Sequence, residues 1–387
     1  MRRGKSCSSV NFILMTGVVL LLFSCRHLPD IQKATDIPVT GGEAGEIKGF
    51  FLLNEGNMGS NKATLDYFDY GSGIYMRNIF ATLNPGVTRE LGDVGNDIKV
   101  YGGKLYAVIN CSNLVEVMDL GSGKHIAQIS IPNCRYITFD KGYAYVSSYA
   151  GPVEFDPTSR KGYVAKIDTL SLTEVASCVV GYQPEEMAIS KGKLYVANSG
   201  GYRVPNYDRT VSVIDLSTFQ VTKTIDVAIN LHRMEIDRYG YIYVSSRGDY
   251  YDIPSTVSVI NSATDEVVDY LELLPCTDMT ICGDSLYVYS AAWNNVTQSN
   301  TVSYAIYDVK RRMVVSRNFI TDGTDKEITV PSGIAVNPEN GEILIADAKD
   351  YVTPGMLYCF TKEGRKKWQV STGDIPSHIA FTTKELK

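Results

Sequence analysis

The strongest constraint on this chain is an internal repeat of roughly fifty residues. A Leu-Tyr-Val-like segment, usually preceded by a small polar or Gly turn, recurs along the sequence, and alternating segments rich in β-branched residues favour β-strands. The copies are GGKLYAVIN (102–110), KGYAYVSSY (141–149), GKLYVANS (192–199), YGYIYVSSR (239–247), GDSLYVYSA (283–291) and NGEILIADA (340–348), with GFFLLNEGN (49–57) as a copy that lacks the leading turn. A fixed period of this kind indicates stacked copies of one small unit.

A second strand-like segment follows each copy and closes on a turn-forming residue. An Asp or Asn at this place can bond the backbone two residues further on and start a tight turn. The closing residues lie 46 to 53 residues apart and are Asp69, Asp119, Asp168, Asp215, Asn261, Asp308 and Thr361. Further strand-like segments precede and follow this pair, so each unit holds four short strands, as one propeller blade does.

The sequence therefore predicts an all-β chain, a seven-bladed β-propeller of four-stranded blades that forms a single domain over residues 47–387. The first unit has strand-like segments at 49–55, 63–69 and 74–80, but none that could be its innermost strand. Near the C-terminus, PSHIAF (376–381) is similar to PSGIAV (331–336). We expect residues 375–383 to join the N-terminal blade and close the ring, because closure removes open sheet edges. A two-sheet sandwich is the structural alternative.

The first 25 residues are typical of an export signal. MRRGK is basic, and VNFILMTGVVLLLF is an apolar run of 14 residues, too short for an ordinary transmembrane helix. The run ends in LLFSC, which resembles the lipobox of bacterial lipoproteins. That resemblance implies that Cys25 becomes the lipidated first residue of the mature chain; the alternative is an ordinary signal peptide cut nearby. Residues 26–46 show no periodicity and are predicted to be a flexible tether.

Composition and motifs argue against several classes of function. The formal net charge is −6 and no long basic run occurs, which disfavours nucleic acid as a partner. The absence of CxxC weighs against a zinc site or a thioredoxin-like redox pair. Export would permit disulfides, but most of the cysteines after residue 25 lie in apolar strand segments and are expected to be buried thiols. No GxSxG, HExxH, Walker loop or dinucleotide fingerprint occurs, so no catalytic residue is assigned and a non-enzymatic role is expected.

The loops between the second and third strands of each blade carry the first group of candidate ligand-binding residues. In a propeller these loops all emerge on one face, and here most of them are long, whereas those of the opposite face are short, as in GSGK and LSTF. Tyr and Trp give large contact area, and Arg and Asn give oriented hydrogen bonds. The candidates from these loops are Tyr149, Tyr202, Arg203, Asn206, Tyr207, Tyr250, Tyr251, Trp293, Asn294 and Tyr351.

The starts of the innermost strands open on the same face, around the channel. They add Arg135, His232, Arg233 and His378 to the candidate ligand-binding residues, and they also bring Asn96, Asp97, Tyr136, Glu185, Glu186 and Asp278 near the channel mouth. A zinc site would need three or more convergent ligands, so hydrogen-bonded histidines are expected rather than metal ligands. No metal or cofactor is expected. A metal-dependent hydrolase or lyase that uses Asp97, Glu185 and Asp278 is the least favoured alternative.

The opening NEGNMGSNKATLDYFD (54–69), together with the repeated LYV and VSVID segments, resembles the YncE-like propeller lipoproteins of Bacteroidetes, which include the BtuG-type surface cobalamin-binding proteins. That resemblance implies an outer-membrane lipoprotein at the cell surface, with the periplasmic face as the alternative, which touches the membrane only through its lipid. It further implies capture of a corrinoid as transported cargo, not as a cofactor, and hand-over to a TonB-dependent transporter of the BtuB type. Glycan capture is the alternative, because relatives in the group are encoded beside glycan-uptake systems.

Overall fold

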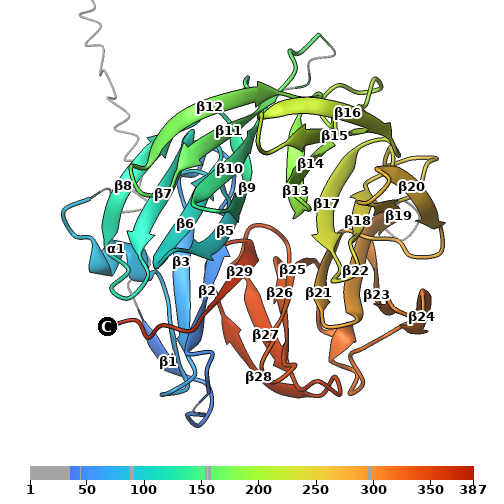
Figure 1. Ribbon diagram of the computed structural model, residues 1–387. Coiled ribbons are helices and arrows are strands. Elements are labelled where there is room, and N and C mark those ends of the chain that lie inside the picture. The colour runs from blue at the N-terminus through green and yellow to red at the C-terminus, as the bar shows by residue number, and fades with distance from the viewer. Residues whose placement is uncertain (1–34, 44, 88–90, 153–154, 156–157, 295–298) are drawn as a thin grey trace, which may run out of the picture. The chain divides into compact units, whose positions relative to one another are not determined.

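Seven antiparallel β-sheets make up almost all of the regular structure in the computed structural model (Figure 1). The structure describes residues 35–387 except 44, 88–90, 153–154, 156–157 and 295–298. Six sheets have four strands, and the seventh has the four strands of a blade plus one short outer strand. The predicted seven-bladed β-propeller of four-stranded blades is therefore confirmed. Cys25 and the predicted signal peptide lie outside the described residues.

The strands follow one another along the chain from the inside of each blade to its outside. The first blade holds β29 (Pro376–Thr382), β2 (Gly49–Asn54), β3 (Thr64–Asp69), β4 (Ile74–Met76) and β1 (Asp36–Pro38). The second holds β5 (Gly95–Tyr101), β6 (Lys104–Ile109), β7 (Leu114–Asp119) and β8 (His125–Ser130), and the third holds β9 (Cys134–Asp140), β10 (Tyr143–Ser148), β11 (Tyr163–Asp168) and β12 (Thr173–Val179).

The remaining four blades repeat this order. The fourth and fifth hold β13 (Pro184–Ser190), β14 (Lys193–Asn198), β15 (Thr210–Asp215), β16 (Gln220–Asp226), then β17 (Leu231–Ile236), β18 (Tyr241–Ser246), β19 (Thr256–Asn261) and β20 (Glu266–Leu271). The sixth and seventh hold β21 (Asp278–Cys282), β22 (Ser285–Asn294), β23 (Ser299–Asp308), β24 (Met313–Ser316), then β25 (Pro331–Val336), β26 (Ile343–Asp347), β27 (Met356–Phe360) and β28 (Lys366–Ser371).

Helices contribute little to the described chain. The helical segments there are α1 (Ile79–Leu83), which packs against the first blade, and the single 3₁₀ turn η1 (Thr324–Lys326). Neither segment, nor any other part of the described chain, offers a helix that could cross a bilayer.

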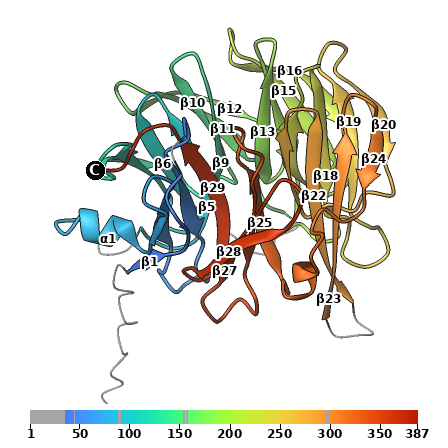
Figure 2. The same ribbon diagram turned by 90° about the horizontal axis from the view of Figure 1, so that it is seen from below.

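The innermost strands close a ring. Each of β5, β9, β13, β17, β21, β25 and β29 contacts the innermost strand of the next blade, and β29 contacts β5. The C-terminal β29 pairs antiparallel with β2 from Gly49–Thr382 to Asn54–Pro376, and the red and blue strands lie side by side in both views (Figures 1 and 2). The prediction that residues 375–383 close the first blade is confirmed.

The outer edge of the first blade differs from the prediction. Residues 36–38 were expected to belong to a flexible tether, but they form β1 and pair with β4 through Ile37 and Tyr75. The backbone N–H of Glu43 donates to the carbonyl of Tyr70, at 2.8 Å. Ile37, Val39 and Ile47 pack against the apolar cluster between the first and seventh blades. Only Ile37 and Val39 alternate, with Pro38 between them and the glycine-rich segment TGGEAGE (40–46) after them, so the run is too short to predict a strand.

The turns between third and fourth strands form as expected. In each unit the closing side chain accepts a hydrogen bond from the backbone two residues further on: Asp69 from Gly71, Asp119 from Gly121, Asp168 from Leu170, Asp215 from Ser217, Asn261 from Ala263, Asp308 from Lys310 and Thr361 from Glu363. The recurrence of these residues is therefore explained by turn formation alone.

The core is divided among the contacts between blades. Each pair of adjacent blades encloses an apolar cluster, such as the one that joins Val108, Val117 and Ile137 of the second and third blades. No blade could bury both of its faces alone, so burial of apolar surface favours the closed ring.

A β-bulge lies near the start of six innermost strands. The pairing register shifts at this point in β5, β9, β13, β17, β25 and β29. In β9, Arg135 and Tyr136 lie opposite Ser147 of β10, and in β17, His232 and Arg233 lie opposite Ser245 of β18. A bulge re-aims side chains that would otherwise alternate between the faces of a strand. Each serine hydroxyl accepts a bulge N–H, Ser147 from Tyr136 and Ser245 from Arg233.

Candidate ligand-binding site

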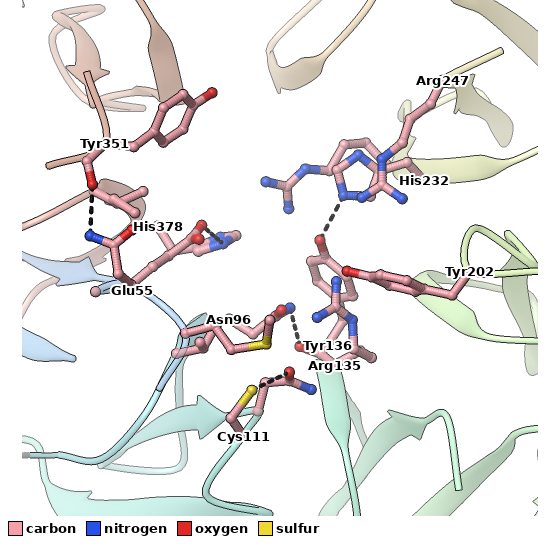
Figure 3. A pocket seen from close by; sticks show the side chains of 17 residues that line it. Glu55, Asn96, Cys111, Arg135, Tyr136, Tyr202, His232, Arg247, Tyr351 and His378 are labelled. Carbon is pink, nitrogen blue, oxygen red and sulfur yellow. Dashed lines mark hydrogen bonds and ion pairs between the residues drawn. The ribbon is translucent and has the colours of Figure 1, made fainter. Parts of the chain in front are cut away.

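A cavity of about 350 Å³ opens at the channel mouth, on the face that carries the loops between second and third strands (Figure 3). Six of the predicted ligand-binding residues line it: Arg135, Tyr202, His232, Arg233, Tyr351 and His378. Glu55, Asn96, Tyr136 and Arg247 also line it. The starts of the bulged strands and the long loops thus meet in one site, as the topology predicted.

Arginines on one wall of the cavity share a single buried carboxylate. Arg135 Nε lies 3.2 Å from Glu185 Oε2, and Arg247 Nη1 lies 3.1 Å from Glu185 Oε1. The Tyr149 hydroxyl donates to Oε1 of the same group at 2.5 Å, and the Ser199 hydroxyl donates to it at 3.3 Å. Burial alone would raise the pKa of Glu185, but the two arginines outweigh burial and hold that pKa below its ordinary value.

A separate ion pair, between Arg233 and Asp278, lies deeper in the channel. Arg233 Nε lies 2.9 Å from Asp278 Oδ1, and Nη2 of the same residue donates to Oδ2 at 3.3 Å. The Tyr136 hydroxyl and His232 Nε2 form a hydrogen bond of 2.8 Å. Burial, followed by the neighbouring arginines, lowers the pKa of His232 well below its ordinary value. His232 is therefore neutral at pH 7 and is held by a hydrogen bond, not by a charge pair.

The opposite wall carries Glu55 and His378 (Figure 3). His378 Nε2 lies 3.8 Å from Glu55 Oε1, and its Nδ1 lies 3.9 Å from Asp97 Oδ1. Burial and then Arg233 lower the pKa of His378 well below its ordinary value, so this histidine too is neutral at pH 7. Asn57 Nδ2 donates to the carbonyl of Tyr351 at 2.6 Å, which ties the rim loop of the first blade to that of the seventh.

Several predicted residues lie outside the cavity. Tyr149 is buried beneath the arginine wall, where it contacts the Tyr202 ring edge to face. Arg203 turns away from the mouth: its guanidinium lies 3.6 Å from the centre of the Tyr182 ring and donates to the carbonyl of Asn206. The side chain of Asn206 is exposed.

The tyrosines of the fourth and fifth rim loops lie on the surface around the mouth. Tyr250 and Tyr251 are 65% and 84% exposed, and both lie close enough to the partly exposed Tyr207 to raise its pKa, after the larger effect of burial. They surround the site instead of lining the cavity.

The predicted loop over residues 291–300 is largely a strand extension. β22 runs to Asn294 and β23 begins at Ser299, with Trp293 paired to Asn300 across the hairpin. The loop prediction is wrong here because Thr301, Val302 and the preceding residues continue the ladder past the length of the other repeats. The side chains of Trp293 and Asn294 lie outside the described residues.

Arg247 and Glu55 are cavity residues that our choice of candidates missed. Each directly follows the second strand of its blade, after YVSS (243–246) or FLLN (51–54). Tyr149 holds the same position after the second strand of the third blade, but its side chain is buried outside the cavity. Position directly after the second strand therefore points to Arg247 and Glu55, but it does not by itself identify a cavity residue.

The channel has a second cavity, of about 390 Å³, at its other end. Arg233 and His378 line both cavities and so form the layer between them. The second cavity is acidic on one side, with Asp97, Glu186, Glu235 and Asp278 around Lys99, and apolar on the other. Burial and the neighbouring Glu186 raise the pKa of Glu235 to about 8.

Metal and thiol chemistry receive no support from the described residues. Within them, no group of three or more His, Cys, Asp or Glu side chains is arranged to hold a metal ion. Glu185 and Asp278, two of the three acids considered for a hydrolase or lyase, are engaged by arginines. The cysteines of the described chain are all free, and of these Cys111 lines the mouth cavity; they are Cys111, Cys134, Cys178, Cys276, Cys282 and Cys359.

Solved structures support the fold. A quinoprotein alcohol dehydrogenase-like protein from Bacteroides thetaiotaomicron matches with a TM-score of 0.57 at 17% identity, over 88% of this chain and 79% of that one. Hydrazine synthase from Kuenenia stuttgartiensis matches with a TM-score of 0.56 at 16% identity, over 70% of this chain and 77% of that one. At such identities the likeness shows a shared architecture only.

A search among curated proteins finds no match. A family profile described as "Domain of unknown function (DUF5074)" matches residues 48–374, which is nearly the whole propeller. The chain therefore belongs to the DUF5074 family, and its fold is a β-propeller.

Proposed function

We propose that this chain is a lipid-anchored binding protein of the outer membrane that captures a bulky polar ligand, most favourably a corrinoid, at the channel mouth. The ligand is then handed to a TonB-dependent transporter of the BtuB type, and no bond is made or broken. The LLFSC segment supports the anchor at Cys25, and the resemblance of residues 54–69 to YncE-like lipoproteins supports the ligand class and the cell-surface location.

The observation that carries the proposal is a ring of exposed apolar and aromatic side chains around a polar cavity. The exposed side chains belong to rim loops of five blades and are Met58, Phe155, Val204, Tyr250, Tyr251, Ile253, Tyr351 and Val352. Several large exposed apolar side chains on one face of a protein are typical of an interaction site. No packing role explains their exposure, since the core lies between the blades.

The size and chemistry of the site fit a ligand that is larger than the cavity. A volume of about 350 Å³ is near the lower end of the range for pockets that hold drug-sized ligands, so a molecule as large as a corrinoid would extend over the rim. A corrinoid has a broad, partly apolar macrocycle edged with amides and a nucleotide arm with a phosphodiester. Tyrosines on the rim can cover the macrocycle, while Arg135, Arg247 and Asn96 can bind the polar groups.

Titration of the full-length protein in mild detergent with cyanocobalamin tests the proposal. We expect heat release and a shift of the corrinoid absorbance bands on binding. Replacing both Tyr250 and Tyr251 with Ala should weaken binding at least about tenfold, since interface tyrosines of this kind each contribute on the order of 1 kcal/mol or more. Tyr270→Ala, at an exposed tyrosine on the outer strand β20, is the matched control and should leave binding unchanged.

No heat and no spectral change at high micromolar cyanocobalamin would contradict corrinoid capture. The same exposed rings could instead stack on sugars, which is the observation that favours glycan capture as the second candidate. A glycan-array signal that is lost in the Tyr250/Tyr251 variant, combined with no response to cyanocobalamin, would select it.

A further inference from the structure

We infer that the arginine wall of the mouth cavity is an oxyanion subsite, which binds a phosphate ester or carboxylate group of the ligand between Arg135 and Arg247. This inference deepens the proposed function and rests on it, because it assigns the part of the ligand that enters the cavity.

The first step is the hydrogen-bonding capacity of the two guanidinium groups. Arg135 uses Nε and Arg247 uses Nη1 to bind Glu185. Within the described residues, the other nitrogen atoms of both groups have no acceptor, while both residues line the cavity (Figure 3). An arginine fork in this state offers donors in the geometry that carboxylate and phosphate oxygens require.

The second step is that Glu185 is itself held in a fixed position. Its Oε1 accepts from Arg247, Tyr149 and Ser199, its Oε2 accepts from Arg135, and the carboxylate is fully buried. The carboxylate therefore holds both arginines in place from behind, because turning toward their remaining donors would break the bonds that Oε1 accepts. Such support by a second layer of hydrogen bonds is what preorganises a binding group.

The third step is the local charge. Arg233 has its own carboxylate in Asp278, whereas Arg135 and Arg247 share one, so this wall carries one uncompensated positive charge. Neutral His232 adds none, and the three arginines contribute to the lowering of its pKa, after burial. Glu55 on the opposite wall balances this charge over the cavity as a whole, so the positive potential is local to Arg135 and Arg247. In a partly dehydrated cavity such a local charge favours an anion more than it would at the open surface.

The fourth step concerns Glu55 on the opposite wall (Figure 3). Its carboxylate faces the same cavity and would repel an anion that filled the whole space. The subsite is therefore one-sided: the oxyanion lies against Arg135 and Arg247, and the rest of the ligand presents N–H or O–H donors to Glu55. A group with one charged end and a polar remainder fits this arrangement better than a small dianion does.

A comparison of two corrinoids tests the inference and separates it from the proposed function. Cyanocobalamin has the phosphodiester, and dicyanocobinamide lacks it. The full-length protein should bind cyanocobalamin about ten to a hundred times more tightly than dicyanocobinamide, as expected for charge-assisted hydrogen bonds. Arg247→Gln should remove most of that preference, and Arg238→Gln, at an exposed arginine of the opposite face, should preserve it. A thermal melt of each variant shows whether a loss of this preference reflects unfolding. Arg135→Lys serves as a second, more conservative variant of the subsite.

The outcomes are distinct. Equal binding of the two corrinoids, or a preference that survives in well-folded Arg247→Gln, would overturn the subsite and leave corrinoid capture standing. If neither corrinoid binds, corrinoid capture fails, and titration with inorganic phosphate and with a glucuronate oligosaccharide decides the subsite. Binding of either probe that is lost in Arg247→Gln supports an oxyanion subsite for another ligand, and no binding of any probe overturns it.

Discussion

Glu185 and Glu235 are the same residue type on neighbouring innermost strands, β13 and β17, yet they are in opposite electrostatic states: Glu185 is buried behind the arginines of the mouth cavity, and Glu235 lines the cavity at the other end of the channel. Glu185 is bound by Arg135 and Arg247, which hold its pKa below the ordinary value against the effect of burial. Glu235 has a pKa raised to about 8 by burial and by Glu186, an effect that Lys99 only partly offsets.

Equivalent strands of the repeated blade therefore hold carboxyl groups in different charge states. A bulge at the start of β13 turns Glu185 toward arginines of the third and fifth blades. Further along β17 the regular alternation has resumed, and Glu235 faces Glu186 and Lys99 across the channel. The mouth thus holds two fixed arginines that share one ionised carboxylate, while the other end holds carboxyl groups that bind protons.

The largest expected difference is in stability. Glu185→Gln leaves two largely buried arginines without their shared countercharge, and removing one partner of a buried charge pair destabilises by about 3–5 kcal/mol. We expect the urea midpoint at pH 7 to fall accordingly. Glu266→Gln, at an exposed position of β20, is the matched control and should leave the midpoint unchanged. An unchanged midpoint in Glu185→Gln would show that the arginines do not depend on this carboxylate.

The features of the fold that follow the repeat could be predicted from sequence, and those that depart from it could not. The period, the closing Asp or Asn of each unit and the PSHIAF segment are local patterns, and each blade repeats them, so seven blades and their closure followed. β1 and the lengthened β22–β23 hairpin were missed, because both depart from the repeat: one adds an edge strand through Ile37, and the other continues its ladder to Trp293.

The candidate site was predicted only in part, for a physical reason. Alternation predicts that one of two consecutive residues faces the channel, but bulges let both members of pairs such as Arg135–Tyr136 and His232–Arg233 line the mouth. The sequence repeat does not predict the directions of side chains in the loops. Nothing in the loop sequence showed that Arg203 would stack on Tyr182 while Arg247 reached Glu185.

The next expected effect concerns the two buried histidines that line the mouth cavity. His232 and His378 have pKa values well below the ordinary value of about 6.5, so they stay neutral in the folded chain and become protonated on unfolding at acidic pH. Their contribution to stability is complete above pH 6.5 and falls as the pH drops below it. At pH 5.5 the loss is about 1.4 kcal/mol for each histidine.

Comparing urea midpoints at pH 7.5 and pH 5.5 measures this effect. The double variant His232→Gln/His378→Gln should show a smaller decrease on acidification than the unmodified protein, by about 3 kcal/mol of unfolding free energy. If both proteins lose the same stability between these pH values, the two histidines take up protons in the folded state as readily as in the unfolded state, which would contradict their lowered pKa values.

The smallest expected effect is at the other end of the channel, and it has the opposite sign to that of Glu185→Gln. Because the pKa of folded Glu235 is about 8, the folded chain binds a proton there that the unfolded chain loses above about pH 4.5. Stability is therefore lost as the pH rises from about 4.5 to 8, and Glu235→Gln should recover about 1–2 kcal/mol at pH 8.5, since cavity water screens this partly exposed group. Urea midpoints at pH 5 and pH 8.5 should show a gain at the higher pH only. A variant that is destabilised at both would mean that Lys99 pairs with Glu235 as Arg247 pairs with Glu185, and that the two ends of the channel follow one rule.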